Sequence, residues 1–183
     1  MDASFLERDT VTVAKELLGC ELVRQTEAGL IRVAITETEA YRGSDDPASH
    51  ASRAVTPRNR LMFGEVGRLY VYLIYGMHLC INVVAHEPGG VGAVLLRAAR
   101  PLEGLELIRG NRGDAPDRNL LNGPGKLAQG LGITRDLNGC DLLAEPPQGL
   151  ALERGAPPAG PILVTPRIGI TKAVDYPWRF VAE

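Results

Sequence analysis

The sequence predicts an α+β fold with a largely antiparallel β-sheet, flanking helices and a protruding β-hairpin. Several apolar segments alternate at strand spacing and are joined by short glycine-containing turns, which is typical of antiparallel pairs. Other segments are apolar at helical spacing, and two of these begin with proline. A length of 183 residues, with 45% hydrophobic and 23% charged residues, suits a single domain spanning 1–183 with a real core.

The first part of the chain is predicted to contain a helix, two strands and a long loop, at 10–18, 21–24, 31–40 and 42–60. Asp9 can cap the helix, and Gly19 can end it. The loop is rich in glycine, proline and small polar residues, which resist regular structure. A long polar loop between ordered elements often carries function.

The rest of the chain is predicted to contain strands at 68–74, 77–85, 92–98, 162–164 and 167–170, and helices at 101–109 and 124–131. The strands at 68–74 and 77–85 meet around Tyr75 and Gly76, which predicts a tight hairpin. Tyr75 thereby places a large aromatic ring at a hairpin turn, a solvent-exposed position that is usually occupied by a polar residue.

Composition excludes several classes of protein. No apolar run approaches the roughly 20 residues needed to span a bilayer, and the polar, acidic N-terminus does not resemble a secretory signal. We therefore expect a cytoplasmic protein. The three cysteines show no C-x-x-C spacing and form no zinc pattern with the three histidines, so we expect no disulfide framework, no metal and no cofactor.

The distribution of charge is more informative than its total. A net charge of −2 and a pI near 6.0 argue against a generic nucleic-acid binder. Residues 47–86, however, contain four arginines and one acid, a local net charge of +3. Such a segment suits contact with phosphates. A solvated loop with incidental arginines explains the charge equally well.

Two closely spaced carboxylates stand beside several aromatic residues. Strand spacing puts Glu37 and Glu39 on one face of the sheet, and Tyr41 continues that face. Four of the five tyrosines lie between 41 and 75. This combination predicts proton transfer next to a flat substrate such as a nucleobase, with Glu39 as general base and Arg97 keeping it ionised. The alternative is that both acids face solvent on an edge strand.

Other candidates also have ordinary explanations. Tyr72 can stack on a substrate, yet tyrosines on one face of a strand more often pack the sheet. His50 can stack or can lie on the surface. Asn82, within an apolar strand, needs a hydrogen-bond partner such as a base edge. Lys126, in the run 123–126, can help bind a phosphate or simply begin a helix.

Taken together, these motifs closely resemble one family, the alkyladenine (3-methyladenine, methylpurine) DNA glycosylases, in a compact bacterial form. The matching segments follow the family's order over nearly the whole chain: 14–19, 37–41, 56–60, 62–63, 69–77, 94–98, 101–104, 123–127 and 167–170.

The resemblance implies a catalytic role for three residues. Glu39 matches the acid that deprotonates the attacking water. Arg97 matches a residue that helps to hold this water, and the backbone carbonyl of Ile168 matches its third partner. No lysine lies near Glu39 in the sequence, which fits direct hydrolysis rather than a Schiff-base step.

The resemblance also implies a binding pocket and a DNA-binding surface. Tyr41 and His50 match residues on one side of a flipped base, and Tyr72 matches the stacking partner on the other. Asn82 matches the amide that screens against normal guanine, and Tyr75 matches the side chain that intercalates into the DNA. The candidate backbone contacts are Arg58, Arg60 and Lys126.

The implied function is base excision repair by a monofunctional DNA glycosylase, which flips alkylated or deaminated purines from duplex DNA and leaves an abasic site. The implied partner is double-stranded DNA containing damaged purines, bound by a monomer in the bacterial nucleoid. Candidate substrates are 3-methyladenine, 7-methylguanine, hypoxanthine and ethenoadenine. The alternatives are a lesion-binding protein without catalysis, a nucleoside- or RNA-modifying enzyme, and a small-molecule hydrolase.

Overall fold

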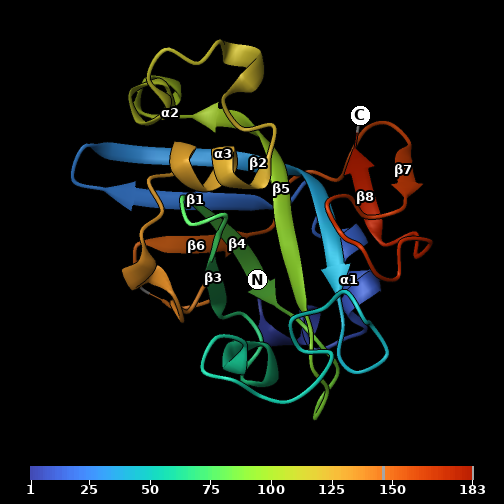
Figure 1. The fold of residues 1–183 in the computed structure, drawn as a ribbon. Helices are drawn as coiled ribbons and strands as arrows, with labels where there is room; N and C mark the ends of the chain where they lie inside the picture. The colour runs from blue at the N-terminus through green and yellow to red at the C-terminus, as the bar shows by residue number, and fades with distance from the viewer. Residues whose placement is uncertain (146, 183) are drawn as a thin grey trace.

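The computed structural model describes residues 1–145 and 147–182 and confirms an α+β fold built on a curled antiparallel sheet (Figure 1). The eight strands among these residues are β1 (Glu21–Thr26), β2 (Gly29–Tyr41), β3 (Leu69–Ile74), β4 (His78–Val84), β5 (Ala93–Glu103), β6 (Leu150–Glu153), β7 (Ile162–Thr165) and β8 (Arg179–Ala182). The three α-helices are α1 (Thr10–Glu16), α2 (Leu105–Arg112) and α3 (Pro124–Gly130).

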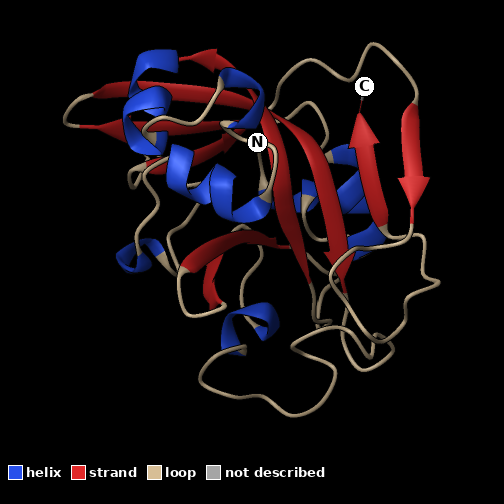
Figure 2. Ribbon diagram, turned by 45° about the horizontal axis from the view of Figure 1, so that its top comes forward, coloured by secondary structure: helices blue, strands red, loops and turns tan. Residues whose placement is uncertain are grey.

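Strand β2 organises the sheet, whose order is β3-β4-β5-β2-β1-β6 with β7 and β8 branching from β2. One edge of β2 pairs with β5. Along its other edge, β2 pairs first with β1, over Gly29 to Ala34, and then with β8, over Glu37 to Glu39. The β7–β8 pair therefore stands beside the second half of β2 (Figure 2), where the predicted acids lie.

The two faces of the sheet bury different kinds of side chain. The main hydrophobic core takes alternate residues of β3, β4 and β5 on one face, including Val71, Ile81 and Leu96. Helix α3 packs on β4 and β5 there, and α2 packs on α3 (Figure 1). Intervening residues on the other face, such as Tyr70 and Tyr72, pack under the long loop in a second cluster. This second face is the one available to form a site.

Helix α1 is held against the strand that carries the acids. The side chain of Asp9 accepts a hydrogen bond from the backbone N–H of Thr12 (2.9 Å), which confirms the predicted cap. The buried hydroxyl of Thr38 donates to the carbonyl oxygen of Ala14 (2.6 Å). Because Thr38 lies between the two acids, this bond ties their part of β2 to α1.

One predicted helix, at 101–109, was placed too early, and one predicted strand, at 167–170, was wrong. The segment 101–103 continues β5, with Pro101 opposite Val33, and α2 begins only after Gly104 turns the chain at φ 76°. The segment 167–170 is not a strand, because Arg167 turns into a buried ion pair and Gly169 has φ 74°. Strands β6 and β8 were not predicted; both are only four residues long.

No helix among residues 1–145 and 147–182 combines the length and apolar character needed to cross a bilayer.

Candidate active site

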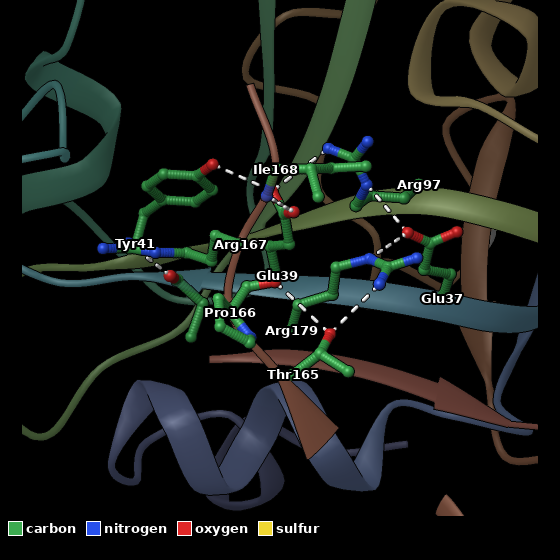
Figure 3. Close-up of polar contacts among 10 residues, drawn as sticks. Glu37, Glu39, Tyr41, Arg97, Thr165, Pro166, Arg167, Ile168 and Arg179 are labelled. Carbon is green, nitrogen blue, oxygen red and sulfur yellow. Dashed lines mark hydrogen bonds and ion pairs between the residues drawn. The ribbon is translucent and has the colours of Figure 1, made fainter. Parts of the chain in front are cut away.

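Glu39 is wholly buried and is held by three hydrogen-bond donors (Figure 3). Its Oε1 accepts the backbone N–H of Ile168 at 2.9 Å. Its Oε2 accepts the hydroxyl of Tyr41 at 2.8 Å and Nη1 of Arg97 at 3.1 Å. The structure thus brings together all three residues of the predicted catalytic group. Ile168 contacts Glu39 through its N–H, a contact that the sequence analysis did not foresee.

Arg97 belongs to a small network of charges (Figure 3). Its Nε donates to Oε1 of Glu37 (2.9 Å), and Nε of Arg179 donates to the same oxygen (2.6 Å). Arg179 also donates to the hydroxyl of Thr165 (3.0 Å). Two acids and two arginines therefore compensate one another, which allows a carboxylate to be buried.

An irregularity in the sheet aims Arg97 at these acids. In the β2–β5 pairing, Glu37 lies opposite Ala98 and Thr38 lies opposite Leu96, so Arg97 is an extra residue on β5. Such bulges redirect a side chain and are common next to active sites. The bulge explains how one guanidinium reaches both Glu37 and Glu39.

Aromatic residues line a cavity of about 580 Å³ above this network. Its size is in the range of small-molecule sites. The lining includes all the predicted pocket residues, together with Arg97 and Ile168: Tyr41, His50, Tyr72, Asn82 and, at the rim, Tyr75. Buried or partly buried Met62, Tyr70 and Cys80 also line it, although the sequence analysis assigned none of them to the pocket.

His50 is arranged differently from the prediction. Its ring packs edge-on against Tyr72, with ring centroids 4.8 Å apart, and its Nδ1 lies 3.0 Å from the hydroxyl of Tyr70. The prediction placed His50 with Tyr41, opposite Tyr72. The reason is that Tyr70 and Tyr72 share one face of β3, and the loop carrying His50 folds over that face.

The cavity environment favours neutral forms of its titratable rings. Burial raises the pKa of Tyr41, and the neighbouring charge of Glu39 raises it further. Burial also raises the pKa of Tyr72. His50 is exposed overall, yet partial desolvation of its packed ring, followed by the charge of Arg58, lowers its pKa from 6.5. Tyr41 is therefore a permanent donor to Glu39 at neutral pH.

Asn82 is buried, and its Nδ2 donates to the carbonyl oxygen of Tyr70 (3.0 Å). This bond satisfies the amide of a polar residue within an apolar strand. It leaves the side-chain oxygen and the second N–H of Asn82 available to another partner.

The turn between β3 and β4 presents Tyr75 to solvent. Tyr75 and Gly76 both have positive φ, 52° and 71°, and the N–H of Met77 donates to the carbonyl of Ile74 (3.2 Å). Two successive positive φ values are the signature of a type I′ hairpin turn. Tyr75 is 81% exposed, which is unusual for an aromatic residue in a strained conformation.

The three predicted backbone contacts lie in different places. Arg58 lines the cavity, with its guanidinium over the ring of Tyr72 (5.6 Å). Arg60 is exposed outside the cavity lining. Lys126 lies in the first turn of α3, where its Nζ donates to Asn122 (2.8 Å). Lys172, which the sequence analysis did not single out, also lines the cavity and is exposed.

A buried ion pair, Asp46–Arg167, joins the long loop to the segment that carries Ile168. Arg167 donates to both carboxylate oxygens of Asp46 (2.6 and 2.7 Å), and neither side chain is exposed. Its guanidinium also lies over the ring of Tyr41 (4.6 Å). The sequence analysis missed this pair, because its two members are 121 positions apart.

Within residues 1–145 and 147–182, no group of three or more histidine, cysteine, aspartate or glutamate side chains is placed to hold a metal ion.

Comparisons with known proteins agree with one another. Residues 4–183 match the family model described as methylpurine-DNA glycosylase. A protein of Methanoculleus marisnigri named "Putative 3-methyladenine DNA glycosylase" is 51% identical over 183 residues, covering 98% of this chain and 93% of that protein. Proteins with the same name in Chlorobaculum parvum and Agrobacterium fabrum are 48% and 49% identical, each over 98% of this chain and over 85% and 87% of their own lengths.

Proposed function

Since this chain belongs to the methylpurine-DNA glycosylase family, we propose that it flips a damaged purine into the aromatic cavity and hydrolyses the N-glycosidic bond with water activated by Glu39. Family membership makes it a DNA glycosylase, a hydrolase of N-glycosyl bonds. The single observation that carries the mechanism is the buried carboxylate of Glu39, held between Arg97 and Ile168 beside the cavity.

Glu39 has one acceptor position left for a water molecule. An ionised carboxylate offers about four lone-pair directions. Three are used, one on Oε1 by Ile168 and two on Oε2 by Tyr41 and Arg97. The remaining direction on Oε1 can accept a proton from water. Glu39 has no exposed surface, so a small shift of Tyr41 or Ile168, both of which line the cavity, must admit this water.

The cavity suits a purine that already leaves readily. Alkylation at a ring nitrogen makes the purine cationic, which strengthens its attraction to aromatic faces and weakens its bond to the sugar. Tyr41 and Tyr72 supply such faces and remain uncharged. Deaminated bases such as hypoxanthine lack this positive charge, so they depend more on the position of Glu39 and its water.

Tyr75 is placed to fill the gap that a flipped nucleotide leaves. Its ring is exposed at the rim of the cavity and its backbone is held in a left-handed conformation. A strained, exposed aromatic residue contributes little to folding, which favours a role in binding. Insertion between base steps compensates part of the unstacking energy.

Backbone contact completes the proposed complex. Arg58 at the cavity, with Arg60 and Lys126 beyond its lining, would neutralise phosphates of a duplex bound by a single protomer. Contacts to phosphates do not depend on the DNA sequence, and an enzyme that repairs lesions within any DNA sequence requires such contacts.

A single-turnover assay on duplexes with one hypoxanthine, ethenoadenine or 7-methylguanine tests the proposal. Alkali cleavage of the product strand reveals abasic sites. We expect release of at least one of these bases by the purified protein. Failure to release any of them, with duplex binding intact, would instead support the alternative of a lesion-binding protein without catalysis.

A comparison of substrates separates a duplex enzyme from a nucleoside hydrolase. Only a stacked duplex provides a gap for Tyr75. Replacing Tyr75 by alanine should therefore impair excision from duplexes and spare any cleavage of free nucleosides.

A further inference from the structure

The buried pair of Asp46 and Arg167 connects the wall of the cavity to the proposed general base. Besides Arg167, the carboxylate of Asp46 accepts the backbone N–H groups of Arg42 and Ala48, both at 3.1 Å. The loop that continues to His50 is thereby fixed at its start. Arg167 meanwhile donates to the carbonyl oxygen of Ala40 (2.9 Å), the residue directly after Glu39.

Arg167 is adjacent to, or in contact with, two of the three residues that donate hydrogen bonds to Glu39. It directly precedes Ile168, whose N–H reaches Oε1 of Glu39. Its guanidinium also supports the ring of Tyr41, whose hydroxyl reaches Oε2. The ring of Trp178 also lies 5.0 Å from this guanidinium.

Stability alone does not account for this arrangement. A buried ion pair can often be replaced by apolar residues of similar volume without loss of stability. Nε of Arg167 is buried and has no hydrogen-bond partner among the described residues, which is a further cost. The planar guanidinium donates several hydrogen bonds in fixed directions, so it can hold several groups in defined positions at once, which an apolar pair cannot do.

We propose that Asp46 and Arg167 form a positioning pair for the hydrolytic step, which holds Ile168 and Tyr41 at the distances that orient the carboxylate of Glu39. The inference rests on the proposed function and deepens it, because it assigns a role to residues that touch neither the base nor the water. It predicts that loss of the pair slows the reaction of bound substrate more than it weakens binding.

The test compares Asp46→Asn with wild type in single-turnover excision of hypoxanthine over a range of enzyme concentrations. Asparagine keeps the shape of the side chain and loses its charge. We expect the maximal rate to fall about 100-fold, because small displacements of reacting groups have effects of this size. We expect the half-saturating concentration to stay within about threefold of wild type, since substrate contacts are retained.

A matched control separates positioning from general destabilisation. Leu150→Ala creates a cavity in β6, at the far edge of the sheet from the site, where Leu150 is fully buried. Both variants are assayed well below their melting temperatures. The Leu150→Ala enzyme should keep its maximal rate within about twofold, because its site geometry is unchanged.

Three results would overturn the inference: a folded Asp46→Asn enzyme with the wild-type maximal rate, a variant that loses affinity alone, or equal slowing by Leu150→Ala. If Asp46→Asn does not fold, the double variant Asp46→Leu/Arg167→Met is tested in its place, because it replaces the ion pair by an apolar pair of similar volume. We expect this enzyme to fold and remain slow, and recovery of the wild-type rate would refute positioning. A wild-type enzyme inactive on every lesion would contradict the proposed function instead.

Discussion

Replacing Glu39 by glutamine tests the proposed chemistry most directly, and the structure gives the expected size of the effect. Glutamine has nearly the same shape but cannot take a proton from water. General-base catalysis contributes about 10²–10⁴ to a rate, so we expect single-turnover excision to slow roughly 1,000-fold. Binding of the same duplex should persist, because Tyr72 and Tyr75, which are proposed to contact the DNA, are unaltered.

The same substitution should also lower stability by a defined amount. With the glutamine oxygen toward Ile168, the amide nitrogen faces Nη1 of Arg97, and in the opposite orientation the nitrogen faces the N–H of Ile168. Either orientation leaves one buried donor unsatisfied, which costs about 1–3 kcal/mol. For a domain of this size, that corresponds to a fall in melting temperature of about 2–12 °C.

Differential scanning fluorimetry and the excision assay, run on the same preparations, measure both effects. The reasoning would be refuted by a Glu39→Gln enzyme that excises within about tenfold of the wild-type rate, because glutamine cannot act as a base. A melting temperature equal to wild type would refute the proposed hydrogen-bond geometry while leaving the catalytic role open to the rate measurement.

Three further predictions concern binding and pH. Tyr75→Gly should slow duplex excision about 10- to 100-fold, because the stacking of the aromatic ring is lost. The same substitution should raise the melting temperature by about 2–4 °C, because glycine accepts a positive φ without strain. The control Met77→Ala, at an exposed position in the same turn, should change the excision rate and the melting temperature much less. Three phosphate contacts should make duplex affinity fall about 40-fold between about 50 and 200 mM salt in fluorescence anisotropy, and a flat response would exclude them. The pKa of His50 is lower in the folded protein than its ordinary 6.5, through partial burial and then Arg58. Because the unfolded chain therefore binds a proton more readily, the contribution of His50 to stability is complete above pH 6.5 and is lost as pH falls below it. Thermal unfolding at several pH values should show this loss in wild type, and an equal loss in His50→Gln would exclude His50 as its source.

The predicted fold was correct where local pattern determines structure. Alternation of apolar and polar residues predicts β3, β4 and most of β2, and the cap at Asp9 marks the start of α1. The errors arise where tertiary contacts override local preference. Pro101 starts no helix because it lies opposite Val33 in the sheet, and the apolar run at 167–170 forms no strand because Arg167 is drawn into the interior.

The site was predictable only in part. Strand periodicity places Glu37, Glu39 and Tyr41 on one face, and residue chemistry suggested partners such as Arg97 and Asn82, while the specific roles came from the resemblance to a family. The bulge at Arg97 leaves no local signal in the sequence, since it depends on the pairing of two strands. The same holds for the pair of Asp46 and Arg167, whose members meet across 121 positions.

The order of the chain has a consequence for how the enzyme becomes active. Glu39 meets its donor from Ile168 across 129 positions, and Glu37 meets Arg179 across 142. Contacts of such separation form late, because the loop-closure entropy must be compensated first. A polypeptide emerging from the ribosome therefore cannot assemble the charge network of the site until β8, which carries Arg179, has been synthesised. Trp178, the only tryptophan, stacks over Arg167 and should report this step. In refolding experiments, excision activity should return with the tryptophan fluorescence and after the sheet signal in circular dichroism.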